Sequence, residues 1–217
     1  MPLFAVRIWL PDRPGALGAV ASRIGAVKGD LIGIDILERG AGRAIDELIV
    51  ELPDPELVPL LLRELCQVDG VDVEDVRPIK DLAIDPRQDA LDTAIALVES
   101  PSVALLLSAL ATRGCRDFEA DWACVIDHNT STPLASVGKA PENTWISAFL
   151  QGSRASLRVA AGETGPDDVA WANLSAADLT LVLGRSGRPF RSRERRQATA
   201  LARIADARWT ELVVRSR

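Results

Sequence analysis

The sequence predicts an α+β protein of two domains, and three observations lead to this prediction. The chain has 217 residues, of which 47% are hydrophobic, enough for two domains of about 80–130 residues with separate cores. Residues 3–80 alternate between strand-like and helix-like periodicity. Residues 88–214 begin with two helical patterns, continue with strand-like runs and end in a third helical pattern.

The first domain opens with a strand, a tight turn and a helix. Apolar side chains alternate over residues 4–10, and they recur at helical spacing over residues 17–27. The connecting residues, 12–17, read Asp-Arg-Pro-Gly-Ala-Leu. Pro14 favours a helix that starts directly after it. Gly15 lets the backbone come close to a ligand, so the first-turn amides are available to bind an anion such as a carboxylate.

Three more strands and a second helix complete this domain. Gly29 is expected to cap the first helix in a left-handed conformation. Residues 31–37 and 44–52 are expected to form a hairpin, residues 57–65 a helix, and residues 71–79 a strand of alternating valines. The order βαββαβ is the ferredoxin-like arrangement, in which two helices cover one face of four antiparallel strands.

The loop at residues 12–17, the turn at Gly29 and the spacing of the elements resemble an ACT domain across residues 3–80. In that family the ligand, often a regulatory amino acid, lies between the first loop of one copy and the start of the second strand of another. Members that bind an amino acid often carry Asn or another polar residue at that strand start, where this chain has Leu31. The resemblance implies a homodimer with a ligand site formed by Asp12, Arg13, Gly15, Ala16, Leu17, Asp30, Leu31 and Ile32.

Two interpretations of Asp12 remain open from the sequence. In the first, Asp12 binds an α-ammonium group while the amides of residues 15–17 bind the α-carboxylate. In the second, Asp12 only caps the following helix, and Arg13 is only solvated.

A polar stretch at residues 81–87 predicts a linker between a first domain, residues 1–80, and a second domain, residues 88–217. Residues 90–98 are expected to form a helix, and Ser100 is expected to be the N-cap of the next one. The remaining elements are expected to be strands at 122–126, 134–137, 169–174 and 179–184, a short helix around 145–149, and a final helix after residue 192.

This order resembles a GAF domain across residues 88–214, most closely over residues 178–204. GAF domains often bind a small molecule beside the sheet, under the short helix. The residues that would line such a pocket are Trp122, Cys124, Trp145, Phe149 and Trp171. The alternative is that these residues are ordinary core and that the cavity is filled, which would leave the domain for dimerisation or partner binding.

The chain lacks a recognisable catalytic constellation, so we expect a protein that is not an enzyme. His128 is its one histidine, and the residues around it read as a turn between strands. No phosphate-binding or dinucleotide motif is present, and we expect no metal and no cofactor. Acid pairs such as Asp46-Glu47 are expected to be exposed strand or turn residues.

Charge and cysteine content limit the partners and the compartment. Net charge is −7 over residues 1–86 and +1 over residues 87–217, which argues against nucleic-acid binding by the first domain. Three scattered cysteines predict reduced thiols, and no apolar run is long enough for a membrane span, so we expect a cytoplasmic protein. Ten arginines and three acidic residues lie after residue 184, so the last part of the chain is basic.

We therefore predict a non-catalytic sensor of a small molecule, expected to be an amino acid, bound at the interface of an ACT-like dimer. The alternative is a module without a ligand that docks on an enzyme or transcription factor through the arginine-rich last helix. The residues that would carry this docking are Arg191, Arg193, Arg195 and Arg196.

Overall fold

The computed structural model describes residues 1–79, 86–153 and 166–215, with side chains of 86 and 87 excepted. The chain divides into two compact units, Met1–Ile84 and Asp85–Arg217, called unit 1 and unit 2 below. The division falls within the predicted linker at residues 81–87, of which residues 81–85 lie outside the described residues. No helix within the described ranges is long and apolar enough to cross a membrane.

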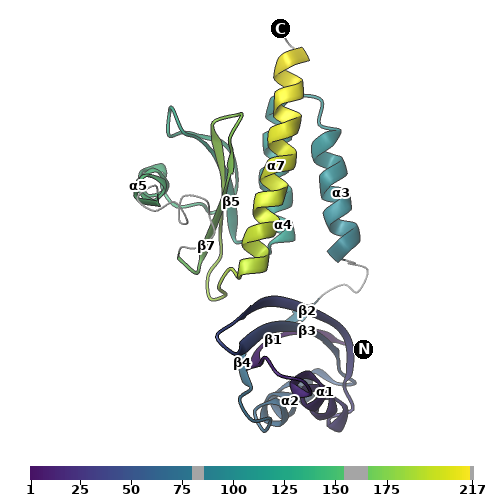
Figure 1. The fold of residues 1–217 in the computed structure, drawn as a ribbon. Coiled ribbons are helices and arrows are strands. Elements are labelled where there is room, and N and C mark those ends of the chain that lie inside the picture. Colours follow the sequence, from purple (N-terminus) through teal and green to yellow (C-terminus); the bar gives the residue numbers. More distant parts are fainter. Residues whose placement is uncertain (80–85, 154–165, 216–217) are drawn as a thin grey trace. The chain divides into compact units, whose positions relative to one another are not determined.

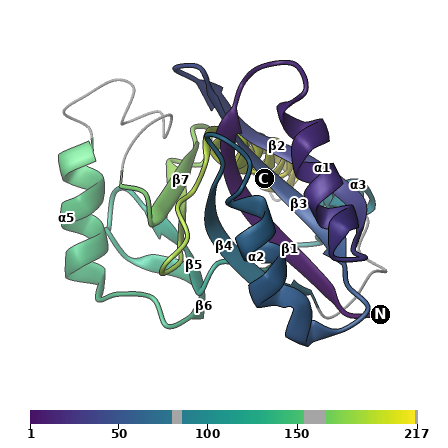
Figure 2. The ribbon, with the colours of Figure 1, turned by 90° about the horizontal axis from the view of Figure 1, so that it is seen from below.

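Unit 1 has the predicted ferredoxin-like order. Its sheet has the strand order β2-β3-β1-β4, with every neighbouring pair antiparallel. Two helices, α1 and α2, lie on one face of this sheet (Figures 1 and 2). Its elements are β1 (Leu3–Pro11), α1 (Ala16–Ala26), β2 (Asp30–Gly40), β3 (Arg43–Glu51), a 3₁₀ turn (Pro55–Leu57), α2 (Val58–Leu65) and β4 (Asp72–Ile79).

The core of unit 1 lies between the sheet and the two helices, as strand alternation requires. Phe4, Val6 and Ile8 of β1 are buried in one cluster with Val20 and Ile24 of α1. Successive strand residues point to opposite faces, so every second residue of β1 contacts the helices. The apolar side chains that alternate over residues 4–10 therefore lie on the face of the sheet that α1 and α2 cover.

The expected left-handed cap at Gly29 is wrong. The positive φ after α1 belongs to Lys28, at 60°, and Gly29 is needed for space. A Cβ at Gly29 would come within 3.0 Å of the side chains of both Ile24 and Leu52. The glycine therefore permits close packing of the end of α1 against the end of the hairpin.

Unit 2 is a sheet with helices on both faces. The strand order is β6-β5-β8-β7, again antiparallel throughout. In Figure 1, α4 and α7 lie on one side of this sheet and α5 lies on the other. The elements are α3 (Pro86–Val98), α4 (Val103–Asp117), β5 (Trp122–Asp127), β6 (Pro133–Gly138), α5 (Asn143–Ser153), β7 (Val169–Leu174), β8 (Leu179–Gly184) and α7 (Ser192–Arg215).

Each face of this sheet has its own core. Leu181 and Leu183 of β8 pack with Leu107 and Ala202 on the side of α4 and α7. The intervening residue, Val182, belongs to a second cluster under α5. A strand with both faces covered is largely apolar, which explains why Leu181, Val182 and Leu183 of β8 form an unbroken apolar run.

The predicted cap of the second helix in this unit also needs correction. The N-cap of α4 is Ser102, whose hydroxyl accepts a hydrogen bond from the Leu105 amide at 3.4 Å. Ser100 instead donates to the Ala96 carbonyl at 2.9 Å and so belongs to the end of α3. The sequence offers two serines near one helix start, and the path of the backbone decides between them.

Candidate functional site

The loop between β1 and α1 is a tight turn whose residues 12–15 are exposed. The Asp12 amide donates to the Gly42 carbonyl at 2.9 Å, which fixes the loop to the β2–β3 turn. Gly15 has a φ of 86°, in the left-handed region that favours glycine, and it is the residue from which α1 begins. Asp12, Arg13 and Pro14 are exposed, whereas Ala16 is buried. The loop therefore presents its backbone and its charged residues outward.

The structure decides between the two interpretations of Asp12 in one respect: its side chain does not cap the helix. Gly15 occupies the N-cap position and α1 has no side-chain cap. A helix leaves its first amides without an intrahelical acceptor. Here the Ala16 amide donates to the Arg13 carbonyl at 3.3 Å, and the amides of Leu17 and Gly18 follow it in the first turn. The Asp12 carboxylate faces Arg39 at 3.9 Å, and Arg13 is paired with Asp69 at 3.7 Å.

The second half of the predicted site lies at the opposite end of the sheet. Asp30 is paired with Glu51 at one end of β3, whereas Pro11, next to the loop, is paired with Arg43 at the other end. The eight steps from Arg43 to Glu51 span about 27 Å at strand geometry. Within one chain the structure therefore does not bring residues 30–32 together with residues 12–17.

The expectation that Asp46 and Glu47 are exposed is wrong. Asp46 is 4% exposed, and its Oδ1 has no hydrogen-bond partner among the described residues. Burial raises the pKa of Asp46; Arg39 lowers it and Asp12 raises it. The sequence did contain a signal, because Asp46 takes the inward position in the alternation of Ala44, Leu48 and Val50.

Glu47 points to the other face of the sheet, where two arginines hold it. Arg7 donates to Glu47 Oε2 from Nε at 3.2 Å and from Nη2 at 3.0 Å, and Arg77 donates to both carboxylate oxygens at 3.1 Å. Burial raises the pKa of Glu47, but the hydrogen bonds and charges of Arg77 and Arg7 outweigh burial and lower it overall. This network joins the three strands β1, β3 and β4.

In unit 2, two residues of the predicted GAF-like pocket, Trp145 and Phe149, lie on α5, and the other three lie on the sheet strands beneath it. Phe149 stacks on Trp145 with ring centroids 5.5 Å apart, and it meets the edge of Trp171 at 5.0 Å. Trp122, Cys124 and Trp171 are buried in the same cluster, whereas Trp145 is 47% exposed. Burial raises the pKa of the Cys124 thiol to about 12. Trp122, Cys124, Trp171 and Phe149 pack in the space between the sheet and α5.

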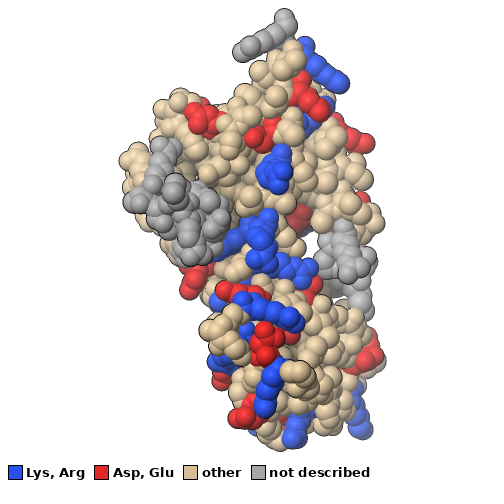
Figure 3. Space-filling model, in the orientation of Figure 1, with Lys and Arg blue, Asp and Glu red and all other residues tan. Residues whose placement is uncertain are grey.

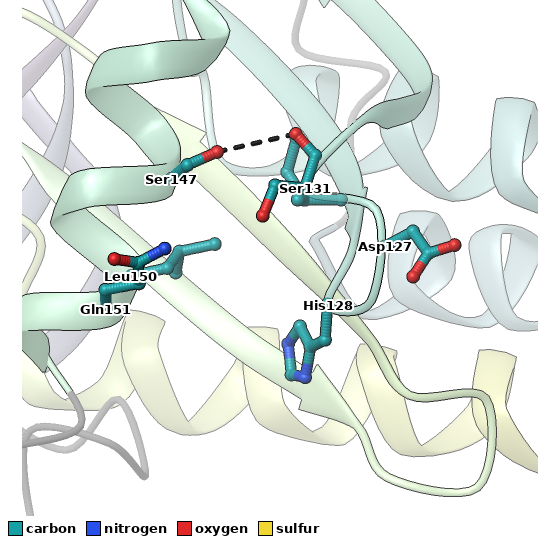
Figure 4. A pocket seen from close by; sticks show the side chains of 7 residues that line it. Asp127, His128, Ser131, Ser147, Leu150 and Gln151 are labelled. Atoms are coloured by element: carbon teal, nitrogen blue, oxygen red, sulfur yellow. Dashed lines mark hydrogen bonds between the residues drawn. The ribbon is translucent and has the colours of Figure 1, made fainter.

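A small pocket lies beside this cluster, between α5 and the β5–β6 turn. Its lining residues are Ser147, Leu150 and Gln151 of α5 together with Ile126 and Asp127 at the end of β5 and His128 and Ser131 of the turn. In Figure 4, Ser147 donates to the Ser131 carbonyl at 3.4 Å, and the Asp127 carboxylate points away from α5. Its volume is about 40 Å³, which is room for a water molecule, whereas pockets for organic ligands measure roughly 300 Å³ or more.

His128 links this pocket wall to the β7–β8 turn through a chain of hydrogen bonds. Its Nδ1 lies 3.2 Å from Asp178 Oδ1, and its Nε2 contacts the hydroxyl of Thr180. That hydroxyl also lies 3.0 Å from Asn173 Oδ1. The sequence pattern did not predict these hydrogen bonds, because Asp178 and Thr180 lie 50 and 52 positions after His128. Thr180 is 1% exposed, so the chain joins two turns inside the unit.

The arginines at the start of α7 differ in exposure, and one of them is part of the interior of unit 2. Arg195 is buried and donates to the carbonyls of Val169 at 3.0 Å and Pro166 at 2.7 Å. Arg195 therefore cannot serve as an exposed docking residue, which corrects the prediction for this position; Arg191 and Arg193 are half-buried and Arg196 is exposed. In Figure 3, the basic side chains over α7 form separate groups with acidic side chains among them.

Similarity to known proteins was found among solved structures. Neither a protein-family model nor a curated protein matches it. Among solved structures, the ACT domain from GTP pyrophosphokinase of Chlorobium tepidum is 19% identical and covers 36% of this chain and 100% of that chain, with a TM-score of 0.30. An uncharacterized protein of Thermotoga maritima is 23% identical and covers 36% and 96%, with a TM-score of 0.29. An unknown protein from Galdieria sulphuraria is 12% identical and covers 95% and 92%, with a TM-score of 0.32.

Proposed function

We propose that this protein is a non-catalytic regulator that senses an amino acid at the loop of residues 12–17. The observation that carries the proposal is the exposed loop before α1, where Gly15 in a left-handed conformation precedes the first turn, whose Leu17 and Gly18 amides lack an intrahelical acceptor. These amides and the helix dipole favour a carboxylate. Asp12, which does not cap the helix, supplies a negative charge for the ammonium group of the same ligand.

We further propose that the sensor is a homodimer joined along β2. This strand is at an edge of the sheet, and its alternating Ile32 and Ile34 are 41% and 43% exposed. If two β2 strands pair antiparallel about a two-fold axis, the Asp30 end of one copy comes beside the Gly40 end of the other. The Gly40 end adjoins the loop, because Gly42 accepts the Asp12 amide. Such a pairing would reunite the two halves of the predicted site.

A role without catalysis is supported by the burial of Thr180 and by the contacts that His128 already makes. Thr180 is buried, and His128 already contacts Asp178 and Thr180 through its two ring nitrogens. A nucleophile has to reach its substrate, and here the hydroxyl lies inside the unit. We propose that this chain of residues holds the β5–β6 and β7–β8 turns together.

We propose that unit 2 is a GAF-like domain with a filled cavity. Support comes from its antiparallel sheet with α4 and α7 on one face and α5 on the other, and from the aromatic cluster under α5. In this proposal unit 2 binds no small molecule, and it takes part in regulation by contacting another protein.

The test is a thermal-shift screen of the full chain against the twenty amino acids, followed by sedimentation with and without each hit. An amino acid at about 100 times its Kd should stabilise the protein by about 2.7 kcal/mol, a shift of several degrees. The shift should be lost in Asp12→Ala and kept in Asp54→Ala, which removes the carboxylate that caps the 3₁₀ turn. Ile32→Asp with Ile34→Asp should give a monomer; a dimer that survives these changes overturns the β2 interface. Absence of a shift with all twenty overturns the sensor.

A further inference from the structure

His128 is the one histidine of the chain, and it lies where two turns of unit 2 meet. Its Nδ1 is 3.2 Å from Asp178 Oδ1 in the β7–β8 turn, and its Nε2 contacts the Thr180 hydroxyl on β8. Its backbone amide also donates to the Asp178 carbonyl at 3.1 Å. His128 therefore connects the β5–β6 turn to the β7–β8 turn through both its ring and its backbone.

The direction of each hydrogen bond around this ring follows from the groups that form it. A carboxylate only accepts hydrogen bonds, so the bond to Asp178 requires a proton on Nδ1. The Thr180 hydroxyl donates its one proton to Asn173 Oδ1 at 3.0 Å, so it accepts from His128, which requires a proton on Nε2. The network of His128, Asp178, Thr180 and Asn173, called the His128 network below, is therefore complete when both ring nitrogens carry a proton.

A neutral imidazole has one proton and cannot form the whole His128 network. If the proton leaves Nδ1, that nitrogen and the Asp178 carboxylate are two acceptors that face each other at 3.2 Å. If the proton leaves Nε2, the Thr180 hydroxyl must turn toward His128, and it gives up its hydrogen bond to Asn173. Thr180 is 1% exposed, so water does not readily replace the lost bond. Loss of one proton therefore costs the network a hydrogen bond.

The groups that face the ring are carboxylates or uncharged. Asp178 faces it from the β7–β8 turn, and Asp127 directly precedes His128 at the end of β5. Thr180 of β8 and Asn173 of β7 are uncharged. The α5 residues that line the adjoining pocket are also uncharged: Ser147, Leu150 and Gln151. The described surroundings of His128 therefore hold no cation that would oppose a positively charged ring.

The turn that His128 connects to its neighbour is a wall of the small pocket beside α5. His128 and Ser131 of this turn line the pocket together with Ser147 of α5 (Figure 4). Ser147 donates to the Ser131 carbonyl at 3.4 Å, which is long for a hydrogen bond from a hydroxyl, so α5 holds the turn weakly. The position of this wall therefore depends on the His128 network.

We propose that His128 is a pH switch in unit 2. With both ring nitrogens protonated it holds the β5–β6 turn against the β7–β8 turn, and loss of one proton releases the β5–β6 turn and with it the pocket wall. The closed turn binds the second proton better than the open turn does, so the closed form is favoured at low pH and weakened as the pH rises. Histidine ordinarily titrates at about pH 6.5, so the change should fall between pH 5.5 and pH 8.

The experiment measures hydrogen exchange of the full chain at pH 5.5 and at pH 8, with each rate compared with the intrinsic rate at that pH to give a protection factor. The reporter is the His128 amide, because its hydrogen bond to Asp178 breaks when the two turns part. Its protection factor should be about 3- to 10-fold lower at pH 8, the range expected for one lost hydrogen bond. Because the chain has no second histidine, few other side chains titrate in this interval.

Two variants separate the proton from the other contacts of the turn. His128→Gln keeps a side chain that forms hydrogen bonds but does not titrate, so the protection of the amide at position 128 should be equal at the two pH values. Asn129→Ala is the matched control, because it removes the hydrogen bond of 2.9 Å from Asn129 Nδ2 to Asp178 Oδ2 and leaves His128 in place. This variant should lower the protection at both pH values and keep the difference between them.

A second readout in the wild type does not depend on the folding of a variant. In NMR spectra, the Thr180 backbone amide and the Asn173 side-chain amide should shift with the same midpoint pH as the His128 ring. Equal protection of the wild type at pH 5.5 and pH 8 would mean that the Asn173 amide turns over and keeps a neutral ring fully bonded, which overturns the switch. A pH difference that persists in His128→Gln also overturns it. Neither result bears on the proposed sensor, whose test is the binding of amino acids to unit 1.

Discussion

Arg185 and Glu194 form a buried salt bridge, with 2.7 Å between Arg185 Nη2 and Glu194 Oε1, that joins the end of β8 to the first turn of α7. Arg185 also donates to the carbonyls of Phe118, Arg188 and Pro189 at 2.7–2.8 Å. The other oxygen of Glu194 accepts the Arg191 amide at 2.8 Å. The pair therefore fixes the point where the last helix meets the sheet.

Replacing Arg185 with Leu should destabilise unit 2 by about 3–5 kcal/mol, because the variant leaves the Glu194 carboxylate buried without its main cation. Urea unfolding monitored by tryptophan fluorescence measures this loss. Arg203→Leu changes an exposed arginine of the same helix and should stay within about 0.5 kcal/mol of the wild type. Equal losses for the two variants would contradict a specific role of the buried pair.

The Glu47 network predicts acid sensitivity of unit 1. The pKa of Glu47 is lowered from its ordinary 4.5, so its contribution to stability is complete above pH 4.5 and is lost as the pH falls through the lowered folded value. Glu47→Gln should lose about 1.5–3 kcal/mol at pH 7, and this difference should shrink at acid pH. Hydrogen exchange of the β1 and β3 amides in both proteins, measured at several pH values, gives this difference in stability. A difference that is constant from pH 7 to pH 3 would exclude the charge as its source.

Asp46→Asn should raise the stability of the protein by about 0.5–2 kcal/mol, because it removes a charge that burial disfavours. The pKa of Asp46 is raised in the folded state, so its ionisation destabilises the fold above the ordinary value of 3.8. The gain should therefore be seen at pH 7 and vanish toward pH 3.8 in thermal unfolding. A strong loss of stability at pH 7 would mean that the ionised carboxylate supports the fold.

Cysteine reactivity should separate the exposed thiol from the buried one. Cys66 is exposed, whereas Cys124 is buried with a pKa of about 12, so almost no thiolate forms there near pH 8. Iodoacetamide should label Cys66 in the native protein, and Cys124 only after unfolding. Mass spectrometry of digested samples reads this out, with urea-unfolded protein as the control. Rapid native labelling of Cys124 would show that the space under α5 opens.

The predictable parts of this protein are those with local causes. Alternation gave the strand of residues 4–10, and Pro14 with Gly15 marked the start of α1. The errors came where a tertiary neighbour decides the outcome. Gly29 is required by the side chains of Ile24 and Leu52, and Arg195 is buried because its donors meet carbonyls of a segment nearly 30 positions away.

The sequence by itself determined the order of strands and helices, the two-part organisation and the exposed loop of residues 12–17, because periodicity, prolines and glycines act over a few residues. Tertiary structure alone decided which charged groups are buried together. Asp46 and Glu47 are neighbours in the chain, yet Asp46 lies on the helix-covered face of the sheet without a full set of partners, and Glu47 pairs with Arg7 and Arg77 on the opposite face. Strand alternation separates them, and only the packed sheet supplies or withholds the partners.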